Sequence, residues 1–569
     1  MKSYRILFLL SFLGSFSDFY AQLSTNEQPI SFGKEFKFAD SDVRAVPAII
    51  MPELDMKLIE AEDRIEDKKC IPPRFGYRHK VNYDINNSGV WHLLPNGDKL
   101  WQLNIICPNA LSVNFCYDKF WIPEGGKFFV YSRDRKNHIG AFTSANNKGD
   151  NINVGTFATT LIYGNDIMLE YYQPKWVTSD AIISIEYIVH GYKLINIGER
   201  SPGESGNCQV NINCDEGNDW QNEKKGVAIV LVHGSRYASG SLINTTNLGH
   251  EPYFLTAHHC LIDSVDASGN NVLDYYSFVW RYEAKGCEKL NAPNSRTTHG
   301  AVILANDSLS DFALLRLIED PMSISDYTPY YLGWDCSGQS DNPGVCIHHP
   351  SGDTKKISSV AFLPTKAVNP YYTGSQDDNF WKVFWKATPN GHGTTEHGSS
   401  GSPLLNAEHK IIGQLYGGDS SCDSLYSADY YGRFDISWNG YNNDSIQRKL
   451  SCWLDSLNTG EQKLEGLLVV RSDSTMAANQ QLYSNIKIMN NSRLTIQGDI
   501  ELKGNSRVIV EPASSLIIDG GILSNTELVL KSGASLIIVN GGIIETRNNF
   551  TAPFGAIVEI ENGQLLINN

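Results

Sequence analysis

The sequence predicts a mainly β fold assembled from several domains. A chain of 569 residues corresponds to about three or four domains of ordinary size. Short apolar stretches separated by Gly, Pro and Asn turn signals, such as Trp101–Ile106 and Lys127–Tyr131, are typical of β-strands. Near the C-terminal end, short β-branched triplets recur at a nearly fixed spacing. We therefore expect β-rich N-terminal, middle and C-terminal domains.

The composition excludes several classes of partner. Asp and Glu (63) outnumber Lys and Arg (47), which gives a net charge of −16 at pH 7. An acidic chain of this kind is not expected to bind nucleic acid or anionic lipid. The 41% of hydrophobic residues suffices for buried cores, but no later segment is apolar for long enough to form a transmembrane anchor.

Residues 1–21 are predicted to be a signal peptide. Lys2 and Arg5 precede a short apolar core, Ile6–Gly14, and Ala21 supplies a small residue at the cleavage position. The core is too short to span a bilayer, so we prefer a signal peptide to an N-terminal anchor. We expect a secreted, extracellular protein whose 11 cysteines can be oxidised.

Residues 22–200 are predicted to contain a β-rich domain. The charge-dense segment 40–69 predicts a solvated, partly helical approach to it. Alternating apolar stretches then run from Trp91 to Tyr187. A polar linker over 198–206 carries Arg200, and such a segment suits proteolytic nicking.

Residues 461–569 predict a β-solenoid-like tail. Leu494, Leu516 and Leu536 begin β-branched triplets that lie 22 and 20 residues apart. The segment Ser515–Ile522 returns almost unchanged as Ser535–Ile543. In a solenoid, each such repeat buries its apolar face on the next one. A small β-sandwich is the alternative.

Three motifs in residues 201–460 carry chemistry. A strand-like stretch, Tyr253–Cys260, delivers His259 at its end. Asp311 precedes the apolar stretch Phe312–Leu317, and Ser400 lies in a loop of Gly and Ser residues. The chain order His, Asp, Ser is that of the chymotrypsin-like double β-barrel proteases.

These residue types suit acyl transfer. We assign Ser400 as nucleophile, His259 as the general base that removes its proton, and Asp311 as the carboxylate that orients the imidazole. The backbone N–H groups of Gly398 and Ser400 are the predicted oxyanion hole. No metal or cofactor is expected: the pair His348–His349 has no further ligand at suitable spacing, which favours a structural role.

The middle third shares a larger set of motifs with one known family. These are Gly206–Cys214, Gly240–Asn244, Tyr253–Cys260, Gly333–Asp335, Ile347–Pro350, Gly398–Pro403, Gly413–Gly418, Asp429–Arg433 and Trp453–Asp455. On these motifs, residues from Cys208 to Leu464 resemble lysyl endopeptidase, a lysine-specific bacterial serine protease with a trypsin-like fold. The resemblance implies that residues 22–200 are a pro-segment and that residues 201–460 are the protease domain.

The resemblance also assigns roles. It places the triad on His259, Asp311 and Ser400, and the specificity carboxylate on Asp429, where a buried negative charge would demand a cationic side chain. Three departures are expected to matter. Tyr416 replaces a family histidine near the triad, and Tyr371 or Tyr372 replaces a shielding tryptophan. Ser399 stands where many trypsin-like enzymes have an acid that receives the new N-terminus.

Two disulfides, Cys208–Cys422 and Cys214–Cys287, are implied by the same resemblance. Cys336 and Cys346 are close enough in sequence to bridge, as are Cys107 and Cys116. These pairings leave Cys70 odd, and they leave Cys260 and Cys452 either paired or free.

The sequence therefore predicts a secreted proenzyme that is cut near Arg200 and then hydrolyses protein or peptide substrates after lysine or another basic residue. Its pro-segment is an expected partner. The tail would serve as a spacer, an export signal or a surface tether. The alternatives are a trypsin-like protease with a different preference before the cut, or a surface adhesin with a vestigial protease domain.

Overall fold

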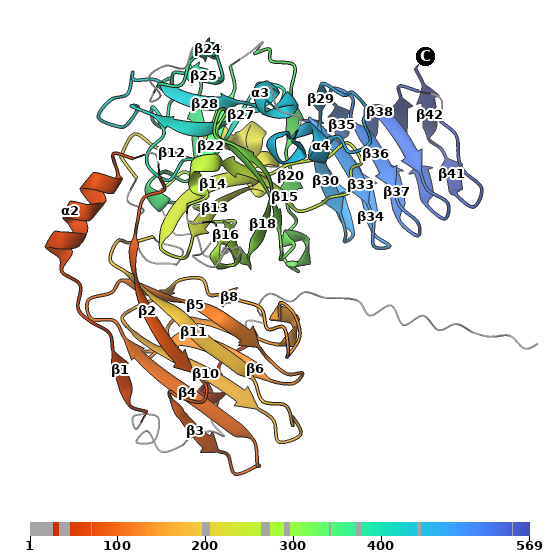
Figure 1. Cartoon of the computed structure of the whole chain (residues 1–569). Helices are drawn as coiled ribbons and strands as arrows, with labels where there is room; N and C mark the ends of the chain where they lie inside the picture. The colour runs from red at the N-terminus through yellow and green to blue at the C-terminus, as the bar shows by residue number, and fades with distance from the viewer. Residues whose placement is uncertain are drawn as a thin grey trace, which may run out of the picture.

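The computed structural model describes residues 27–33, 46–69, 71–195, 205–262, 264, 273–288, 296–340, 343–370, 377–440, 445–548 and 550–568. The predicted signal peptide, Cys70, Arg200, Tyr371 and Tyr372 lie outside the described residues. The predicted mainly β class is confirmed, with three strand-rich units in chain order (Figure 1). Among the helices in these ranges, none is long and apolar enough to cross a membrane.

The N-terminal domain contains two sheets that share one core. Leu103 and Leu169 from the first sheet pack in the same cluster as Phe115 and Ile185 from the second. The first sheet has the order β1 (Ala48–Ile50), β4 (Lys99–Ile106), β10 (Asp166–Gln173), β6 (Lys127–Ser132) and β7 (His138–Phe142), with β3 (Val90–Leu93) also on β4. The second has the order β2 (Gly76–Asp84), β11 (Ile182–Gly191), β5 (Ser112–Trp121) and β8 (Phe157–Ala158), with β9 (Ile162–Tyr163) also on β5. The helix α2 (Met56–Glu66) lies outside both sheets.

The predicted disulfide between Cys107 and Cys116 is wrong, because both thiols are free. Cys107 follows β4 and packs in the core between the two sheets. Cys116 lies on β5 in a different cluster, which includes Tyr275 of the middle domain. Since side chains alternate along a strand, Phe115 and Tyr117 face the core and Cys116 faces away from it.

The middle domain contains two largely antiparallel sheets. The strand Val227–Val232 is strongly apolar and is buried at every position. One sheet has the order β17 (Arg296–His299), β16 (Ser277–Trp280), β13 (Val227–Val232), β14 (Arg236–Leu242), β15 (Tyr253–Ala257), β19 (Phe312–Leu317) and β18 (Ala301–Asp307). The other has the order β12 (Val210–Asn211), β23 (Lys356–Ser359), β22 (Val345–His348), β26 (Pro403–Leu405), β27 (Lys410–Gly418), β28 (Asp429–Arg433), β25 (Phe380–Val383) and β24 (Thr365–Ala367), with β21 (Gly333–Asp335) on β27 and β29 (Lys463–Leu464) on β21. Two short helices, α3 (Phe434–Asn439) and α4 (Ser451–Leu454), complete it.

Two predicted disulfides of this domain are confirmed and one is wrong. Cys208 bonds Cys422, and Cys214 bonds Cys287. Cys336 and Cys346 are both free, because their side chains are buried in separate hydrophobic clusters. Cys260 and Cys452 are also free.

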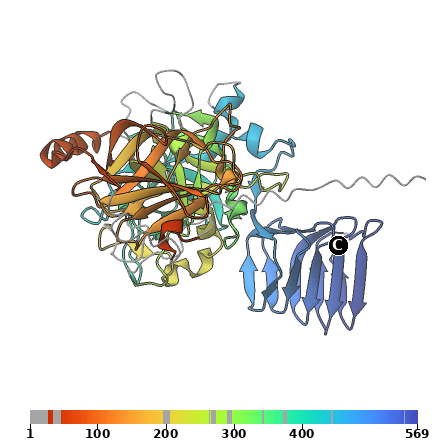
Figure 2. The ribbon, with the colours of Figure 1, turned by 90° about the horizontal axis from the view of Figure 1, so that it is seen from below.

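The C-terminal tail is a β-solenoid, as predicted, and not a sandwich. Its strands pair in parallel, and the two repeated segments stack in register, with Ser515 opposite Ser535 and Leu516 opposite Leu536. Figure 2 shows the strands side by side in a stack that leads away from the middle domain. The strands are β30 (Gly466–Val470), β31 (Ser474–Met476), β32 (Gln480–Leu482), β33 (Ser484–Ile488), β34 (Arg493–Ile496), β35 (Asp499–Leu502), β36 (Arg507–Val510), β37 (Ser515–Asp519), β38 (Ile522–Leu530), β39 (Ser535–Val539), β40 (Ile543–Thr546), β41 (Ile557–Glu561) and β42 (Gln564–Ile567).

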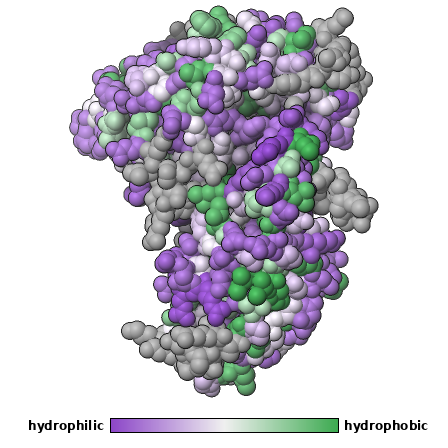
Figure 3. Space-filling view, turned by 90° about the vertical axis from the view of Figure 1, so that its left-hand side faces the viewer, coloured by the Kyte–Doolittle hydropathy of each residue, from purple (hydrophilic) through white to green (hydrophobic). Residues whose placement is uncertain are grey.

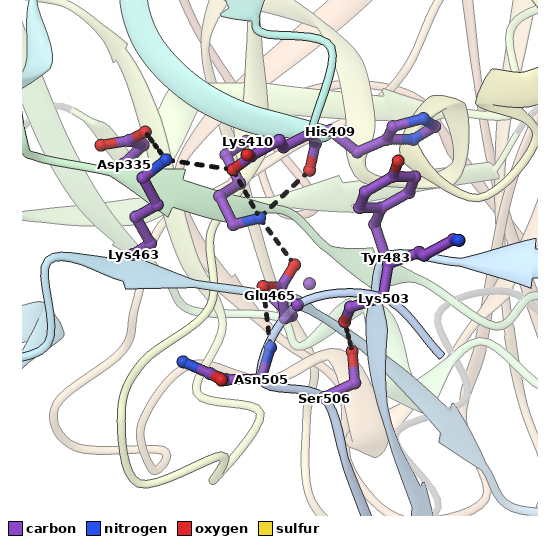
Figure 4. Close-up of polar contacts among 12 residues, drawn as sticks. Asp335, His409, Lys410, Lys463, Glu465, Tyr483, Lys503, Asn505 and Ser506 are labelled. Atoms are coloured by element: carbon purple, nitrogen blue, oxygen red, sulfur yellow. Dashed lines mark hydrogen bonds and ion pairs between the residues drawn. The ribbon is translucent and has the colours of Figure 1, made fainter. Parts of the chain in front are cut away.

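Solenoid and middle domain are joined by polar contacts (Figure 4). Lys410 of β27 forms a buried ion pair, at 2.8 Å, with Glu465, which directly precedes β30. Beside this pair, Lys463 of β29 contacts Asp335 of β21 at 3.3 Å. The His409 ring stacks on Tyr483 of the tail, with ring centroids 4.5 Å apart. The strand β30 also pairs with β20 (Tyr330–Tyr331) of the middle domain. The tail is therefore fixed to the domain that precedes it.

The N-terminal domain is attached on another side of the middle domain. Phe75 donates its backbone N–H to Ser235 O at 2.9 Å, and Tyr237 donates to Pro73 O at 3.2 Å. Phe75 and Tyr237 lie in one buried cluster that spans both domains. Figure 3 shows that the face viewed there is mainly hydrophilic, with a compact hydrophobic patch on the N-terminal domain below.

Candidate active site

Strand pairing brings His259 and Asp311 together. β15 and β19 run antiparallel, with Ala257 opposite Phe312, so that the end of β15 lies beside the beginning of β19. His259 follows the first strand and Asp311 precedes the second. Asp311 adopts a φ of +55°, in the left-handed region, at the turn that enters β19.

The contact between these side chains is direct and buried. His259 Nδ1 lies 2.8 Å from Asp311 Oδ2, and the backbone N–H of His259 donates to Asp311 Oδ1 at 3.0 Å. The two side chains are 9% and 3% exposed. Burial alone would lower the pKa of His259, but the Asp311 carboxylate outweighs it and raises that pKa well above its ordinary value. The carboxylate also fixes which imidazole nitrogen faces it.

The loop that carries Ser400 packs against the strands that position His259. Ser239 of β14 donates its backbone N–H to Ser400 O at 2.8 Å and its hydroxyl to Gly398 O at 2.9 Å. Gly401 has a φ of +82°, and a Cβ there would lie 2.2 Å from Thr256 Oγ1. Only glycine fits this close approach between the loop and β15.

The predicted oxyanion donors lie in the same tight loop. The N–H groups of Ser399, Gly401 and Ser402 donate to Glu396 O, Leu415 O and Ser399 O. Gly398 has a φ of +92°, and a Cβ there would lie 2.4 Å from the Tyr237 ring. Among the described residues, no acceptor faces the N–H of Gly398 or Ser400.

His259 and Ser400 line one cleft, which has a volume of about 1210 Å³. The side chains of Thr395 and Ser420 line it as well, and so does Tyr416. The cleft therefore contains a base, a hydroxyl and a row of polar groups within one concave surface. Such a combination is typical of hydrolase active sites.

Asp429 lies behind the wall of this cleft and is fully buried. Its Oδ2 accepts hydrogen bonds from Trp385 Nε1 (2.6 Å), Thr395 Oγ1 (2.6 Å) and Ser420 Oγ (2.5 Å). Desolvation raises the pKa of Asp429, although these donors act in the opposite direction. The sequence motifs indicate Asp429 but not Thr395 or Ser420, because single hydroxyl residues in loops give no signal of their own.

Tyr416 contacts the candidate base edge to face. Its ring centroid lies 5.7 Å from that of His259, at an interplanar angle of 83°. Phe380 also packs against Tyr416, with ring centroids 5.2 Å apart. The departure identified in the sequence thus places a phenol directly against the imidazole.

No metal centre is found in the described part of the chain, where no group of three or more His, Cys, Asp or Glu side chains could hold an ion. His348 and His349 are both fully buried. Their ring nitrogens face Ser399, Ser358 and the Asp353 carbonyl, at 2.7–3.0 Å.

Comparisons with known proteins concern the middle domain. Residues 202–432 match the family model of the lysyl endopeptidase C-terminal domain. A curated lysyl endopeptidase of Pseudomonas aeruginosa is 30% identical over 247 residues, which cover 41% of this chain and 50% of that protein. This chain therefore spans about half the length of the relative that it matches.

Solved structures resemble the chain only distantly. The active form of the Rv3671c protease from M. tuberculosis is 14% identical, with a TM-score of 0.25. The match covers 38% of this chain and 81% of that protease chain. Deg5 is 15% identical, also with a TM-score of 0.25. That match covers 38% of this chain and 88% of the Deg5 chain. Over residues 202–432, the middle of this chain is therefore similar in sequence to the lysyl endopeptidase C-terminal domain.

Proposed function

We propose that the protein is a secreted serine endopeptidase that hydrolyses peptide bonds after lysine. The observation that carries this proposal is the buried contact of His259 Nδ1 with Asp311 Oδ2, at 2.8 Å, beside Ser400 in one cleft. A hydroxyl, an imidazole and a carboxylate in this arrangement are the parts that acyl transfer requires.

The mechanism follows from these groups. As Ser400 Oγ attacks the substrate carbonyl carbon, His259 Nε2 takes the hydroxyl proton and Asp311 stabilises the imidazolium. The N–H groups of Gly398 and Ser400 bind the developing oxyanion. His259 then gives the proton to the leaving amine, and water, activated by the same imidazole, hydrolyses the acyl-enzyme.

Asp429 supports selection of a cationic side chain before the cut. A fully buried carboxylate behind the cleft wall favours a positive charge in the cleft and disfavours a neutral side chain, which would leave it uncompensated. The hydroxyls of Thr395 and Ser420 both donate to Asp429 Oδ2. Their remaining lone pairs are therefore available to accept from a substrate.

The same hydrogen bonds favour lysine over arginine. A guanidinium binds best by a planar, two-pronged contact with a carboxylate. Asp429 Oδ2 already accepts from three donors, so it is a poor partner for such a fork. An ammonium is a compact donor, and it can reach the hydroxyl oxygens of Thr395 and Ser420 without displacing those bonds.

The N-terminal domain fits the role of a pro-segment that restrains the site. Its residues 67–69 and 71, which we call the strap, line the cleft together with His259 and Ser400. Before the strap, Glu66 forms an ion pair with Arg236 of the middle domain at 2.7 Å. After it, Pro73 O accepts from Tyr237, whose ring packs on Gly398. We propose that the strap hinders substrate entry until the chain is processed.

The buried carboxylate of Asp63 links the helix before the strap to residues that follow the strap. Asp63 of α2 contacts Arg74 Nε at 2.9 Å and Lys193 Nζ at 2.8 Å, and it accepts from Tyr192 OH. Burial opposes its ionisation, yet the bonds from Lys193 and Tyr192 hold the pKa of Asp63 below its ordinary value. The cluster thus links α2 to the segment that leads toward the predicted cut near Arg200.

Secretion fits the two disulfides of the middle domain, since such bonds persist in oxidising compartments.

The test of the proposed function uses the purified protein and peptides that differ only in the residue before the cut. Cleavage after lysine, lost in Ser400→Ala, is the expected result. An intact protein that cleaves none of the peptides and does not react with an organophosphonate would refute the proposal and favour an adhesin with a vestigial protease domain.

A further inference from the structure

The residue before the candidate nucleophile is held from inside the domain by a buried histidine. His348 lies at the end of β22 and is 0% exposed. Its Nδ1 lies 2.7 Å from Ser399 Oγ, and its Nε2 lies 3.0 Å from Ser358 Oγ on β23. Neither the proposed mechanism nor the specificity of the cleft uses this histidine.

The hydrogen bonds around His348 have a single consistent set of directions. Ser358 Oγ donates its proton to Thr394 O at 2.9 Å, so it must accept from His348 Nε2–H. His348 Nδ1 therefore carries no proton and accepts from Ser399 Oγ–H. Ser399 Oγ in turn accepts from the backbone N–H of Glu396 at 3.2 Å. Every member of this chain is satisfied, as a buried polar network requires.

Ser399 is also the centre of the loop that presents the nucleophile. Its N–H donates to Glu396 O at 3.0 Å, and its carbonyl accepts from Ser402 N–H at 3.0 Å. Fixing the Ser399 side chain therefore fixes the backbone between Glu396 and Ser402. Gly398 and Ser400, whose N–H groups are the proposed oxyanion donors, lie on either side of it.

This inference rests on the proposed function and adds a residue to the groups that support hydrolysis. We infer that His348 is a positioning residue for hydrolysis: as a neutral acceptor for Ser399, it holds the nucleophile loop in its reactive form. This link lies wholly within the second sheet and the loop, so it is present whether or not the chain has been cut. In many trypsin-like enzymes an acid at this position is fixed by an ion pair with the new N-terminus. Ser399 cannot form that ion pair, and its hydrogen bond to His348 fixes the loop instead.

These contacts require a neutral imidazole that accepts a hydrogen bond at Nδ1 and donates one from Nε2. Burial, with Lys356 nearby, lowers the pKa of His348 to about 3, so the ring stays neutral across the working range of the enzyme. An asparagine at this position can place its Oδ1 where Nδ1 lies and can still accept from Ser399. A glutamine can place its Nε2 where the ring Nε2 lies, which keeps the bond to Ser358 and loses the one to Ser399.

The test compares His348→Gln, His348→Asn and Ser399→Ala in the full chain, with kcat and KM for a lysyl peptide amide normalised to the concentration of titratable active sites. We expect kcat to fall by about 10- to 100-fold in His348→Gln and Ser399→Ala, since small displacements of a reacting group have effects of this order. KM should change by less than about twofold, and His348→Asn should retain most of kcat. The double variant His348→Gln/Ser399→Ala should lose no more than either single variant.

A second buried pair provides the matched control. His299 Nδ1 lies 3.0 Å from Ser277 Oγ, the residue is 4% exposed, and burial lowers its pKa to about 3, yet it belongs to the other sheet. His299→Gln should leave kcat unchanged. Equal losses in His299→Gln and His348→Gln, or an unchanged kcat in His348→Gln, would overturn the inference, whereas an inactive wild-type protein would instead refute the proposed function. Nitrogen NMR of labelled histidine gives a second readout: a proton on His348 Nδ1 would contradict the assigned bonds.

Discussion

The ammonium group of Lys410 lies 2.8 Å from the carboxylate of Glu465, and both side chains are buried where the solenoid meets the middle domain (Figure 4). Lys410 begins β27, and the same strand carries Tyr416, which contacts His259. The first turn of the tail is therefore part of the framework that supports the candidate site.

Removing this ion pair should destabilise the protein. In Glu465→Gln, the buried Lys410 loses its nearer charged partner and keeps only the half-exposed Glu408, at 3.5 Å. A loss of up to about 3–5 kcal/mol in unfolding free energy is expected. Denaturant unfolding of the full chain measures it. The control is Glu501→Gln, which removes a partly exposed contact with Lys503 and should cost less than about 1 kcal/mol. Equal effects of the two variants would contradict a structural role for the junction.

Asp311→Asn should reduce kcat by about 10⁴-fold, because the amide no longer stabilises the imidazolium and can favour the wrong tautomer of His259. Steady-state hydrolysis of a lysyl peptide measures the loss. Asp326→Asn, at a half-exposed surface ion pair with Arg296, is the control and should leave kcat unchanged. A loss below tenfold in Asp311→Asn would show that this carboxylate is not the orienting acid.

The pH dependence of activity follows from the raised pKa of His259. The base works only when neutral, so kcat/KM should rise with pH and reach half its maximum above pH 6.5, the ordinary pKa of histidine. Without the neighbouring charge, Asp311→Asn should move this midpoint to lower pH. In stability, the raised pKa contributes most below the pKa of the unfolded chain, and the contribution is lost as pH rises through the folded value. A midpoint that does not move would refute the coupling.

Asp429→Asn should weaken the preference for a positively charged side chain. Without the buried carboxylate, kcat/KM for a lysyl peptide should fall by roughly 10²- to 10³-fold. Hydrolysis after a neutral side chain of similar length should fall much less. The comparison of a lysyl with a norleucyl peptide tests this, and Asp419→Asn, at an acid that lines the cleft itself, serves as control. An equal loss for both peptides would place Asp429 outside substrate selection.

Loosening the strap should activate the uncut chain. Asp63→Asn weakens the contacts to Arg74 and Lys193, so the unprocessed protein should hydrolyse lysyl peptides faster than wild type. Rates are measured before processing, with gel analysis to confirm that the chain is intact. Glu60→Gln removes only an exposed pair with Arg64 on the same helix and should not change the rate. If the uncut wild-type chain is already fully active, the strap is not inhibitory.

Local patterns in the sequence determined much of this molecule. The solenoid was predictable because each repeat pairs with its own neighbour, so that Leu516 and Leu536 meet in register. The family resemblance also predicted the bonds Cys208–Cys422 and Cys214–Cys287. The pairing of Cys107 with Cys116 failed because nearness in sequence does not determine which face of a strand a side chain occupies.

Only the tertiary structure determined the contacts made between distant elements. The bond of His348 to Ser399 depends on where β22 lies relative to the nucleophile loop, and the donors to Asp429 come from loop positions far apart in the sequence. The same holds for Lys410 and Glu465, which belong to different domains. The sequence by itself determined the strands, the repeat and the types of reactive groups, because these depend on local spacing. The packing of sheets decided which of those groups share a buried environment, because desolvation and hydrogen bonding act through space and not along the chain.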